Sequence, residues 1–319
     1  MFLRLLTAAL AAFLALPAAA EPLRVAIQKT GTTGWEIAAA QALGLDKAEG
    51  LELSITELAT TDAGKIALQG GSADVIISDW LWVARERASG AKLAFYPAST
   101  AIGAVMAKPG AVKTIADLAG KKLGVAGGPV DKSWLLLKAF ALKQGLDLET
   151  SATIVYGAPP LLAEKLAQGE LDAALEFWNF AVDLEARGFA RAIDLVDVEK
   201  ALGARGTPVV TGYVFDEGFA AKHEKPLAQF IRMLKAVKAA LPHDDRAWAA
   251  ASARTGAKDP AVLKLYRTRY AAGVPVRSIA DEAADAATLY AELAKIGGEK
   301  LVGPAKTLDA GVFWKGPLP

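Results

Sequence analysis

The chain has 319 residues, and its 36 lysines and arginines nearly balance its 35 aspartates and glutamates. No basic stripe stands out, so the sequence gives no support for nucleic acid as a partner. It contains no cysteine, which excludes disulfides, a lipidated cysteine, and cysteine nucleophiles or metal ligands. The length predicts about two domains with a substantial buried core.

Residues 1–20 have the pattern of a secretory signal peptide. Arg4 gives a positively charged start, residues 5–16 form an apolar run too short to span a bilayer, and residues 18–20 offer a small-residue cleavage site. A buried N-terminal helix is the alternative, and it leaves the cleavage pattern unexplained. We therefore expect export to the periplasm and a mature chain that begins at Glu21.

The mature chain alternates short apolar runs with helical patterns. Such alternation predicts an α/β fold, with βα units on a largely parallel sheet. From residue 226 to 290 the sequence becomes mainly helical and rich in alanine. The predicted strands span residues 23–28, 51–58, 74–78, 121–126, 152–156 and 171–177, and the predicted helices between them span 36–43, 63–68, 133–144 and 161–168.

Two parts of the chain resemble each other. In residues 69–80 and again in residues 168–178, a helix ends at Gln-Gly, an aspartate opens a strand, and a tryptophan follows six residues later. A second pair of segments runs from a strand through a glycine-containing loop to Trp35 and to Trp134. Two lobes of like design would explain both pairs, while chance similarity among βαβ units is the alternative. Since ligands bind beyond the carboxyl ends of strands, we expect all four tryptophans around one cleft.

Two segments resemble type II periplasmic binding proteins: residues 113–125 (KTIADLAGKKLGV) and residues 69–78, from Gln69-Gly70 to Ser78. Within that class, the chain resembles the nitrate, sulfonate and taurine branch of importer-linked binding proteins. The resemblance covers essentially the whole mature chain. Residues 77–82 (ISDWLW) and 127–134 (GGPVDKSW) resemble a subgroup associated with quinoprotein dehydrogenases. The ligand of that subgroup is pyrroloquinoline quinone.

The resemblance implies two lobes, two hinge crossings and a helical C-terminal region. One lobe would hold residues 21–100 and 210–319, and the other residues 101–209, with closure by hinge motion. It further implies a monomer that captures a small molecule and delivers it to a membrane ABC permease and its ATPase. No required cofactor and no enzymatic activity are expected on this basis.

Two loops are the strongest candidates for ligand contact. In residues 28–35, glycines permit close approach and free N–H groups at a helix start favour an anion, although an ordinary capped loop explains the threonines equally well. In residues 127–134, Lys132 stands beside such N–H groups, which suits a carboxylate or a sulfonate. A solvated lysine is the alternative for Lys132.

Aromatic and charged residues complete the predicted site. Trp80, Trp82 and Trp178 offer flat faces to a planar ligand, with core packing as the alternative. Arg85 can grip a carboxylate or belong to a surface charge cluster. The predicted ligand-binding residues are Lys29, Thr32, Trp35, Ser78, Asp79, Trp80, Trp82, Arg85, Thr100, Gly128, Asp131, Lys132, Ser133, Trp134, Glu176, Trp178 and Tyr213.

Three functions follow from these residues. The first is a binding protein for a planar, polyanionic solute, with pyrroloquinoline quinone as the best single candidate. The second is a binding protein for a small alkanesulfonate or related anion. The third is an enzyme on the same fold, which the sequence disfavours: it has no nucleophile elbow, zinc motif or P-loop, and His223 and His243 lie far from the predicted loops.

Overall fold

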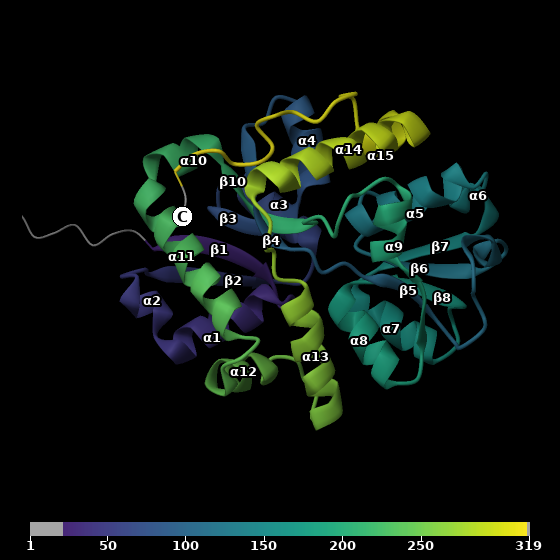
Figure 1. The fold of residues 1–319 in the computed structure, drawn as a ribbon, viewed down its shortest axis with the longest axis horizontal. Coiled ribbons are helices and arrows are strands. Elements are labelled where there is room, and N and C mark those ends of the chain that lie inside the picture. Colours follow the sequence, from purple (N-terminus) through teal and green to yellow (C-terminus); the bar gives the residue numbers. More distant parts are fainter. Residues whose placement is uncertain (1–21, 318–319) are drawn as a thin grey trace, which may run out of the picture.

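The computed structural model describes residues 22–317, so the predicted signal peptide and the start at Glu21 lie outside the described residues. Two α/β halves stand side by side, and each is built on a five-stranded sheet (Figure 1). No helix within residues 22–317 has the length and apolar character needed to cross a bilayer.

The first sheet has the strand order β2-β1-β3-β10-β4. β1, β2 and β3 run parallel, whereas β10 runs antiparallel to both of its neighbours. Val75 and Ile76 of β3 are fully buried, as expected of a central strand covered on both faces. The strands are β1 (Leu23–Gln28), β2 (Leu53–Leu58), β3 (Val75–Asp79), β4 (Leu93–Ser99) and β10 (Thr211–Asp216).

The second sheet has the order β7-β6-β8-β5-β9 and repeats the design of the first. β6 is parallel to β7 and β8, and β5 is the antiparallel strand between β8 and β9. The two sheets therefore match strand by strand, which agrees with the internal similarity of the sequence. The strands are β5 (Ala104–Ala107), β6 (Lys122–Ala126), β7 (Thr153–Gly157), β8 (Ala173–Glu176) and β9 (Ala190–Asp194).

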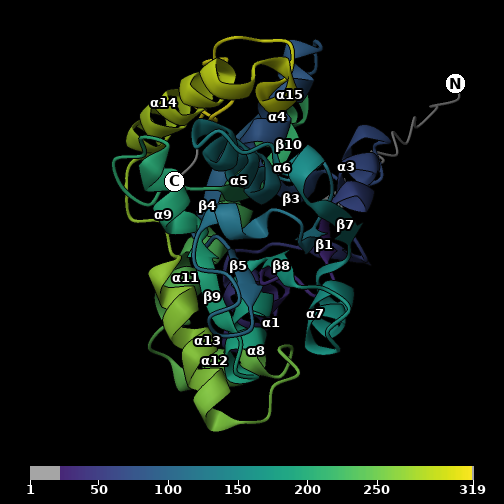
Figure 2. The ribbon, with the colours of Figure 1, turned by 90° about the vertical axis from the view of Figure 1, so that its right-hand side faces the viewer.

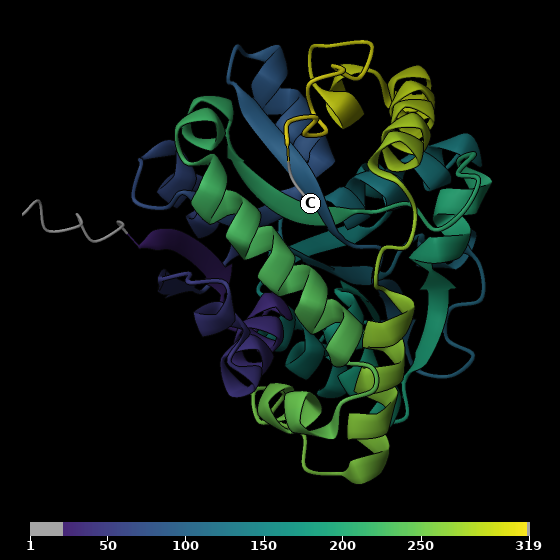
Figure 3. The ribbon, with the colours of Figure 1, turned by 60° about the vertical axis from the view of Figure 1, so that its left-hand side comes forward.

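Helices cover both sheets. The long α11 lies across the first sheet (Figure 3), and α8 of the second half lies beside α13 (Figure 2). In the first half and the C-terminal region the helices are α1 (Thr33–Leu43), α2 (Leu45–Ala48), α3 (Thr61–Gln69), α4 (Trp80–Ala88), α10 (Glu217–Lys222), α11 (Glu224–Ala240), α12 (Asp245–Ser252), α13 (Pro260–Ala272), α14 (Ile279–Gly297) and α15 (Glu299–Val302). In the second half they are the 3-10 helix η1 (Ile115–Leu118), α5 (Lys132–Lys143), α6 (Leu148–Ser151), α7 (Pro159–Ala167), α8 (Trp178–Ala186) and α9 (Leu195–Ala201).

The chain passes from one sheet to the other twice, between β4 and β5 and again before β10. The segment from α13 to α14 contacts both passages. Thr100 N donates to the carbonyl oxygen of Gly273 at 2.9 Å, and Val209 N donates to Glu282 Oε2 at 2.7 Å. In the C-terminal region, α14 packs against α5 of the second half, whereas α15 packs against α4 of the first. The C-terminal helices therefore contact both halves, and the predicted lobe boundaries near residues 100 and 210 stay a prediction.

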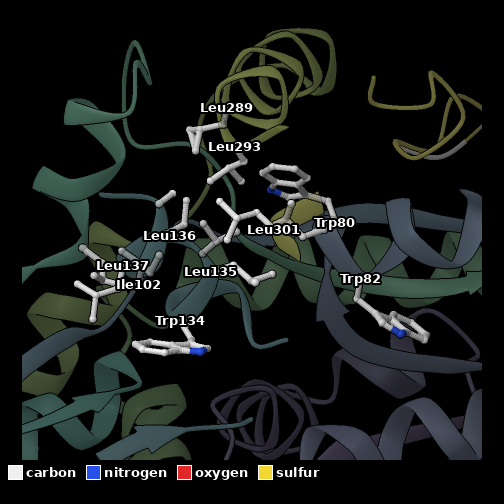
Figure 4. Close-up of a cluster of buried hydrophobic side chains, with 14 of the residues drawn as sticks. Trp80, Trp82, Ile102, Trp134, Leu135, Leu136, Leu137, Leu289, Leu293 and Leu301 are labelled. Atoms are coloured by element: carbon white, nitrogen blue, oxygen red, sulfur yellow. The ribbon is translucent and has the colours of Figure 1, made fainter. Parts of the chain in front are cut away.

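A cluster of buried apolar side chains joins the two halves near the second passage. We call it the bridging core; its members are Trp80, Leu136, Leu289, Leu293 and Leu301. Figure 4 shows the ring of Trp80 against leucines of α14 and α15, with Leu136 of α5 close by. Trp80 Nε1 also donates to the carbonyl oxygen of Val209 at 3.0 Å. Trp80 thus packs α4 against α5 and α14 and bonds it to the second passage between the sheets.

Candidate functional site

A cavity of about 110 Å³ lies between the two halves. The segments that follow four parallel strands line this cavity: those after β1 and β3 of the first sheet and those after β6 and β8 of the second. Ligand sites of parallel α/β sheets lie at the same place, beyond the carboxyl ends of the strands. The wall is completed by α3, α11, α13 and the first passage between the sheets. Among the predicted site residues, those that line the cavity are Thr32, Ser78, Asp79, Gly128, Asp131, Lys132, Ser133 and Trp178.

The other predicted site residues lie outside this cavity wall. They are Lys29, Trp35, Trp80, Trp82, Arg85, Thr100, Trp134, Glu176 and Tyr213. The expectation of four tryptophans around one cleft is therefore wrong, because among the residues that the structure describes Trp178 is the one tryptophan that lines the cavity. The roles of the lining residues in ligand binding stay predictions.

Trp80 and Trp82 miss the cavity because α4 begins directly after β3. α4 starts at Trp80, so Trp80 and Trp82 do not continue the strand and instead point about 200° apart around a helix. Trp80 enters the bridging core, and the face of Trp82 lies 5.6 Å from Lys65 Nζ. Trp134 is fully buried with its edge toward Tyr156. These rings serve packing rather than a ligand face.

Trp35 is buried just behind the cavity wall. Its ring centroid lies 5.7 Å from that of Trp178 and 5.2 Å from that of Tyr266, and both pairs meet edge to face. Trp178 also meets Tyr266 at 6.2 Å. Since Trp178 begins α8 of the second half and the other two rings belong to the first, this aromatic contact holds the halves together beside the cavity.

Three further predicted residues have structural partners that explain their positions. The guanidinium of Arg85 donates to the carbonyl oxygens of Lys300 and Leu301, so it anchors α15 rather than a ligand. Thr100 belongs to the first passage between the sheets. Lys29 follows β1, where its backbone N–H donates to the carbonyl oxygen of Leu58 at 2.9 Å.

Glu176 ends β8 in an apolar setting. It is fully buried, and neither carboxylate oxygen has a well-formed hydrogen bond within the part of the chain that the structure describes. Burial raises the pKa of Glu176 well above its ordinary value of 4.5, and the nearby Phe177 backbone N–H opposes this only weakly. Burial therefore favours the neutral, protonated form of Glu176 in the folded protein.

This neutral acid predicts a pH-dependent stability. Between pH 4.5 and the raised pKa, the folded protein keeps a proton that the unfolded chain has lost, so the free energy of unfolding falls by up to about 1.4 kcal/mol per pH unit as pH rises. Glu176→Gln removes this loss and is expected to be more stable than the natural protein at pH 8, but not at pH 4. Urea unfolding between pH 4 and 8 measures the difference. The exposed Glu52→Gln is the control, and parallel curves for Glu176→Gln and the natural protein would contradict the prediction.

Sequence reasoning missed a buried network centred on Glu36. One carboxylate oxygen accepts from Tyr270 Oη at 2.9 Å and pairs with Lys238, and the other accepts from Tyr213 Oη at 3.0 Å. Burial, with the charge of Glu36, raises the pKa of both tyrosines well above the ordinary value. Tyr213 was predicted to contact ligand directly, but it supports Glu36, which lines the cavity with Lys238 and Tyr270.

The four helices that start at the cavity differ in how their first turns are capped. Asp79 caps α4 and Asp131 caps α5, each by accepting a backbone N–H at 2.8 Å. α1 and α8 follow Thr32 and Phe177, and within residues 22–317 neither receives a side-chain cap. In α1, Gly34 N and Trp35 N already donate to the carbonyl oxygens of Gly31 and Thr32, which leaves the N–H of Thr33 together with the first N–H groups of α8. The positive ends of two helix dipoles at the cavity wall favour an anion.

The lysines of the cavity wall already have acidic neighbours. Lys65 Nζ donates to Asp62 at 3.1 Å, Lys238 pairs with Glu36, and Lys132 Nζ lies 4.0 Å from Asp131. Over the described residues, no three His, Cys, Asp or Glu side chains gather in a way that could hold a metal ion. The cavity is thus a mixed polar site in which uncapped helix ends, more than excess positive charge, can hold an anion.

Comparison with known proteins places the chain in a family. The NMT1/THI5 like family model matches residues 34–247. No curated protein matches the chain in sequence. Among solved structures, the alkanesulfonate-binding protein SsuA from Xanthomonas axonopodis pv. citri, bound to MOPS, superposes with a TM-score of 0.72 at 23% identity and covers 93% of this chain and 99% of its own.

Two other structures give the same result. The periplasmic aliphatic sulphonate binding protein SsuA from Escherichia coli has a TM-score of 0.67 at 20% identity, covering 91% of this chain and 96% of its own. A protein from Bordetella bronchiseptica RB50 has a TM-score of 0.72 at 22% identity, covering 88% and 93%. The predicted fold class is confirmed as the two-lobed type II periplasmic binding protein fold, and the chain belongs to the NMT1/THI5-like family.

Proposed function

We propose that this protein is a periplasmic solute-binding protein that captures a small sulfonate, or a closely related anion, for an ABC importer. The observation that carries the proposal is the meeting of two uncapped helix N-termini, those of α1 and α8, at one cavity between the halves. Asn179 Nδ2 donates to the carbonyl oxygen of Thr30 at 3.2 Å and links these two helix starts directly. An anion there would receive donors from both halves and favour the closed arrangement.

Family membership and fold support this class of ligand. Two of the similar structures carry names that describe sulfonate-binding proteins. The likeness extends along nearly the whole of each chain, which supports the proposal that the cavity between the two halves is the ligand site. Export to the periplasm, delivery to a membrane permease and a monomeric state form part of the same proposal.

Pyrroloquinoline quinone fits this cavity less well. A tricyclic ligand with several carboxylates calls for flat aromatic faces and unpaired cations. Trp80 and Trp82 point elsewhere, and the lysines of the wall have carboxylates beside them. A small anion needs only the helix ends and a polar lining.

Calorimetric titration of the exported protein tests the proposed function. Ethanesulfonate is expected to bind one molecule per chain. Ethyl methyl sulfone, a neutral compound of similar size, is expected to show no measurable binding, because the helix ends interact favourably with charge. Equal binding of both compounds would contradict an anion site. Binding of pyrroloquinoline quinone without binding of ethanesulfonate would overturn the proposal in favour of the planar ligand.

A further inference from the structure

A second cavity, of about 10 Å³, lies between the halves beside the main cavity. We call it the small cavity. Trp80 and Leu289 of the bridging core form part of its wall, and most of the other lining side chains are also apolar. Its three charged residues are Asp79, Lys132 and Glu199, of which Asp79 and Lys132 also line the main cavity. These two residues therefore separate one cavity from the other.

Glu199 of α9 brings a carboxyl group to the small cavity without any hydrogen-bond partner for it. The residue is fully buried, and within residues 22–317 neither of its carboxylate oxygens accepts a hydrogen bond. Buried polar groups normally have such partners, and a cavity of this volume has room for about one water molecule. The ionisation of Glu199 therefore depends strongly on the charges around it.

Most of the charges that face Glu199 are negative. Burial is the main cause that raises the pKa of Glu199 well above its ordinary value of 4.5, and the charges of Asp194 and Glu282 raise it further. Asp194 stands directly before α9, Glu282 belongs to α14, and Asp79 lines the same small cavity. Lys132 of α5, the helix that packs against α9, acts in the opposite direction.

Two arginines of the same region are paired with other carboxylates. Arg191 Nε donates to Asp194 Oδ2 at 2.9 Å, and Arg277 Nη1 donates to Asp285 Oδ2 at 2.7 Å. Neither arginine is among the groups that shift the pKa of Glu199. Among the described residues, Lys132 is thus the cation that counters a charge on Glu199.

The same ammonium group stands beside the proposed anion site. Lys132 Nζ lies 4.9 Å from the ring centroid of Phe177, the residue that precedes α8. It lies 4.0 Å from Asp131 Oδ2, beyond hydrogen-bond range, so this neighbour does not hold it by a hydrogen bond. One positive charge therefore serves both cavities.

We propose that Glu199 takes up a proton from solvent when an anion binds at the α1 and α8 ends, because the anion and the Glu199 carboxylate compete for Lys132. With the anion bound and Glu199 ionised, one buried ammonium would face two negative charges besides that of Asp131, and protonation of Glu199 removes one of them. Glu199 is then a positioning residue that acts on the ligand through Lys132. This inference rests on the proposed function.

The sign of the pH dependence follows from this competition. Anion binding raises the pKa of Glu199 above its value in the free protein. Affinity for the anion is therefore constant below the pKa of the free protein and falls as pH rises above it, by up to about tenfold per pH unit for one proton.

Calorimetry with ethanesulfonate between about pH 5 and pH 9 tests this linkage. Amine buffers such as Tris and triethanolamine suit the titration, because their cations do not compete for an anion site and their enthalpies of ionisation differ. We expect the affinity to fall with rising pH. At the pH of steepest change, we expect a binding enthalpy that differs between buffers by the amount that uptake of up to one proton requires.

Glu199→Gln keeps the size of the side chain and is expected to lose more than half of this proton uptake. Asp197→Asn is the control, because Asp197 belongs to the same helix but is 76% exposed, and it should behave as the natural protein does. Uptake that is unchanged in Glu199→Gln would assign the proton to another group, such as Asp131, and overturn the inference. Binding of ethanesulfonate without proton uptake in the natural protein would also overturn it and leave the proposed function standing, whereas no binding at all would overturn both.

A measurement without ligand tests the pairing of Glu199 with Lys132. The ¹³C carboxyl signal of Glu199, identified by its loss in Glu199→Gln, reports the titration of this group by nuclear magnetic resonance. In Lys132→Met its midpoint is expected to move to higher pH, since the countering cation is gone. Lys143→Met is the matched control, because Lys143 also extends from α5 to α9 but donates to the carbonyl oxygen of Ala201 at 2.9 Å. A midpoint that is the same in Lys132→Met and Lys143→Met would overturn the inference.

Discussion

Trp80→Ala is expected to lower the free energy of unfolding by about 3–5 kcal/mol, the cost typical of truncating a buried tryptophan. The side chain is 3% exposed, and its ring fills the bridging core between α4, α5 and α14. Truncation also leaves the Val209 carbonyl without the indole donor that it has at 3.0 Å. Urea unfolding followed by circular dichroism measures the loss.

Trp178→Ala is the matched comparison. Trp178 is only partly buried and lies at the cavity wall, so its truncation is expected to cost less stability and to weaken ligand binding. Trp80→Phe keeps much of the ring volume and should fall between Trp80→Ala and the natural protein. Trp80→Ala could instead unfold at the same urea midpoint as the natural protein and bind ligand poorly. That result would mean that Trp80 acts at the cavity and that its packing in the bridging core adds no stability.

The sequence predicted strand positions well in the parallel βα units of both sheets. The predicted strand at 23–28 coincides with β1, and those at 74–78 and 152–156 differ from β3 and β7 by one residue. Such runs need no distant information, because burial on both faces of a covered sheet requires them. The strands β4, β5, β9 and β10 were not predicted. β5 and β10 each join their sheet only after a passage between the halves, and β4 and β9 are the edge strands that pair with β10 and β5.

The position of cavity-lining residues was predicted where it depends on local rules. Parallel strands end at the cavity, so Thr32, Asp79 and Asp131 lie at its wall, and their roles in ligand binding stay predictions. Side-chain direction was predicted poorly, because a helix that starts one residue after a strand rotates the next side chains away from the strand pattern. The Glu36 network was missed for another reason: its tyrosine partners lie 177 and 234 residues further along the chain.

Glu36→Ala is expected to destabilise the protein by about 3–5 kcal/mol. The substitution leaves the ammonium of Lys238, whose side chain is 11% exposed, without its carboxylate. It also removes the acceptor of two buried tyrosine hydroxyls, Tyr213 and Tyr270. Urea unfolding at neutral pH measures the combined loss, and the ethanesulfonate titration shows whether the cavity wall is disturbed as well.

A surface ion pair provides the control. Glu57 pairs with Arg254, and their side chains are 36% and 34% exposed, so water screens the interaction. Glu57→Ala is therefore expected to cost about 1 kcal/mol or less.

The double variant Glu36→Leu with Lys238→Met separates the two causes of the Glu36→Ala loss. It removes both charges of the pair and is expected to recover part of the stability, since no buried ion then lacks its partner. Tyr213 and Tyr270 would still lack their acceptor, so recovery should stay incomplete. Because Glu36 and Lys238 both line the cavity, water could enter and solvate an unpaired ammonium. If Glu36→Ala lowers the free energy of unfolding no more than Glu57→Ala does, such water replaces the carboxylate as the partner of Lys238. The Glu36 network would then order the cavity wall without stabilising the fold.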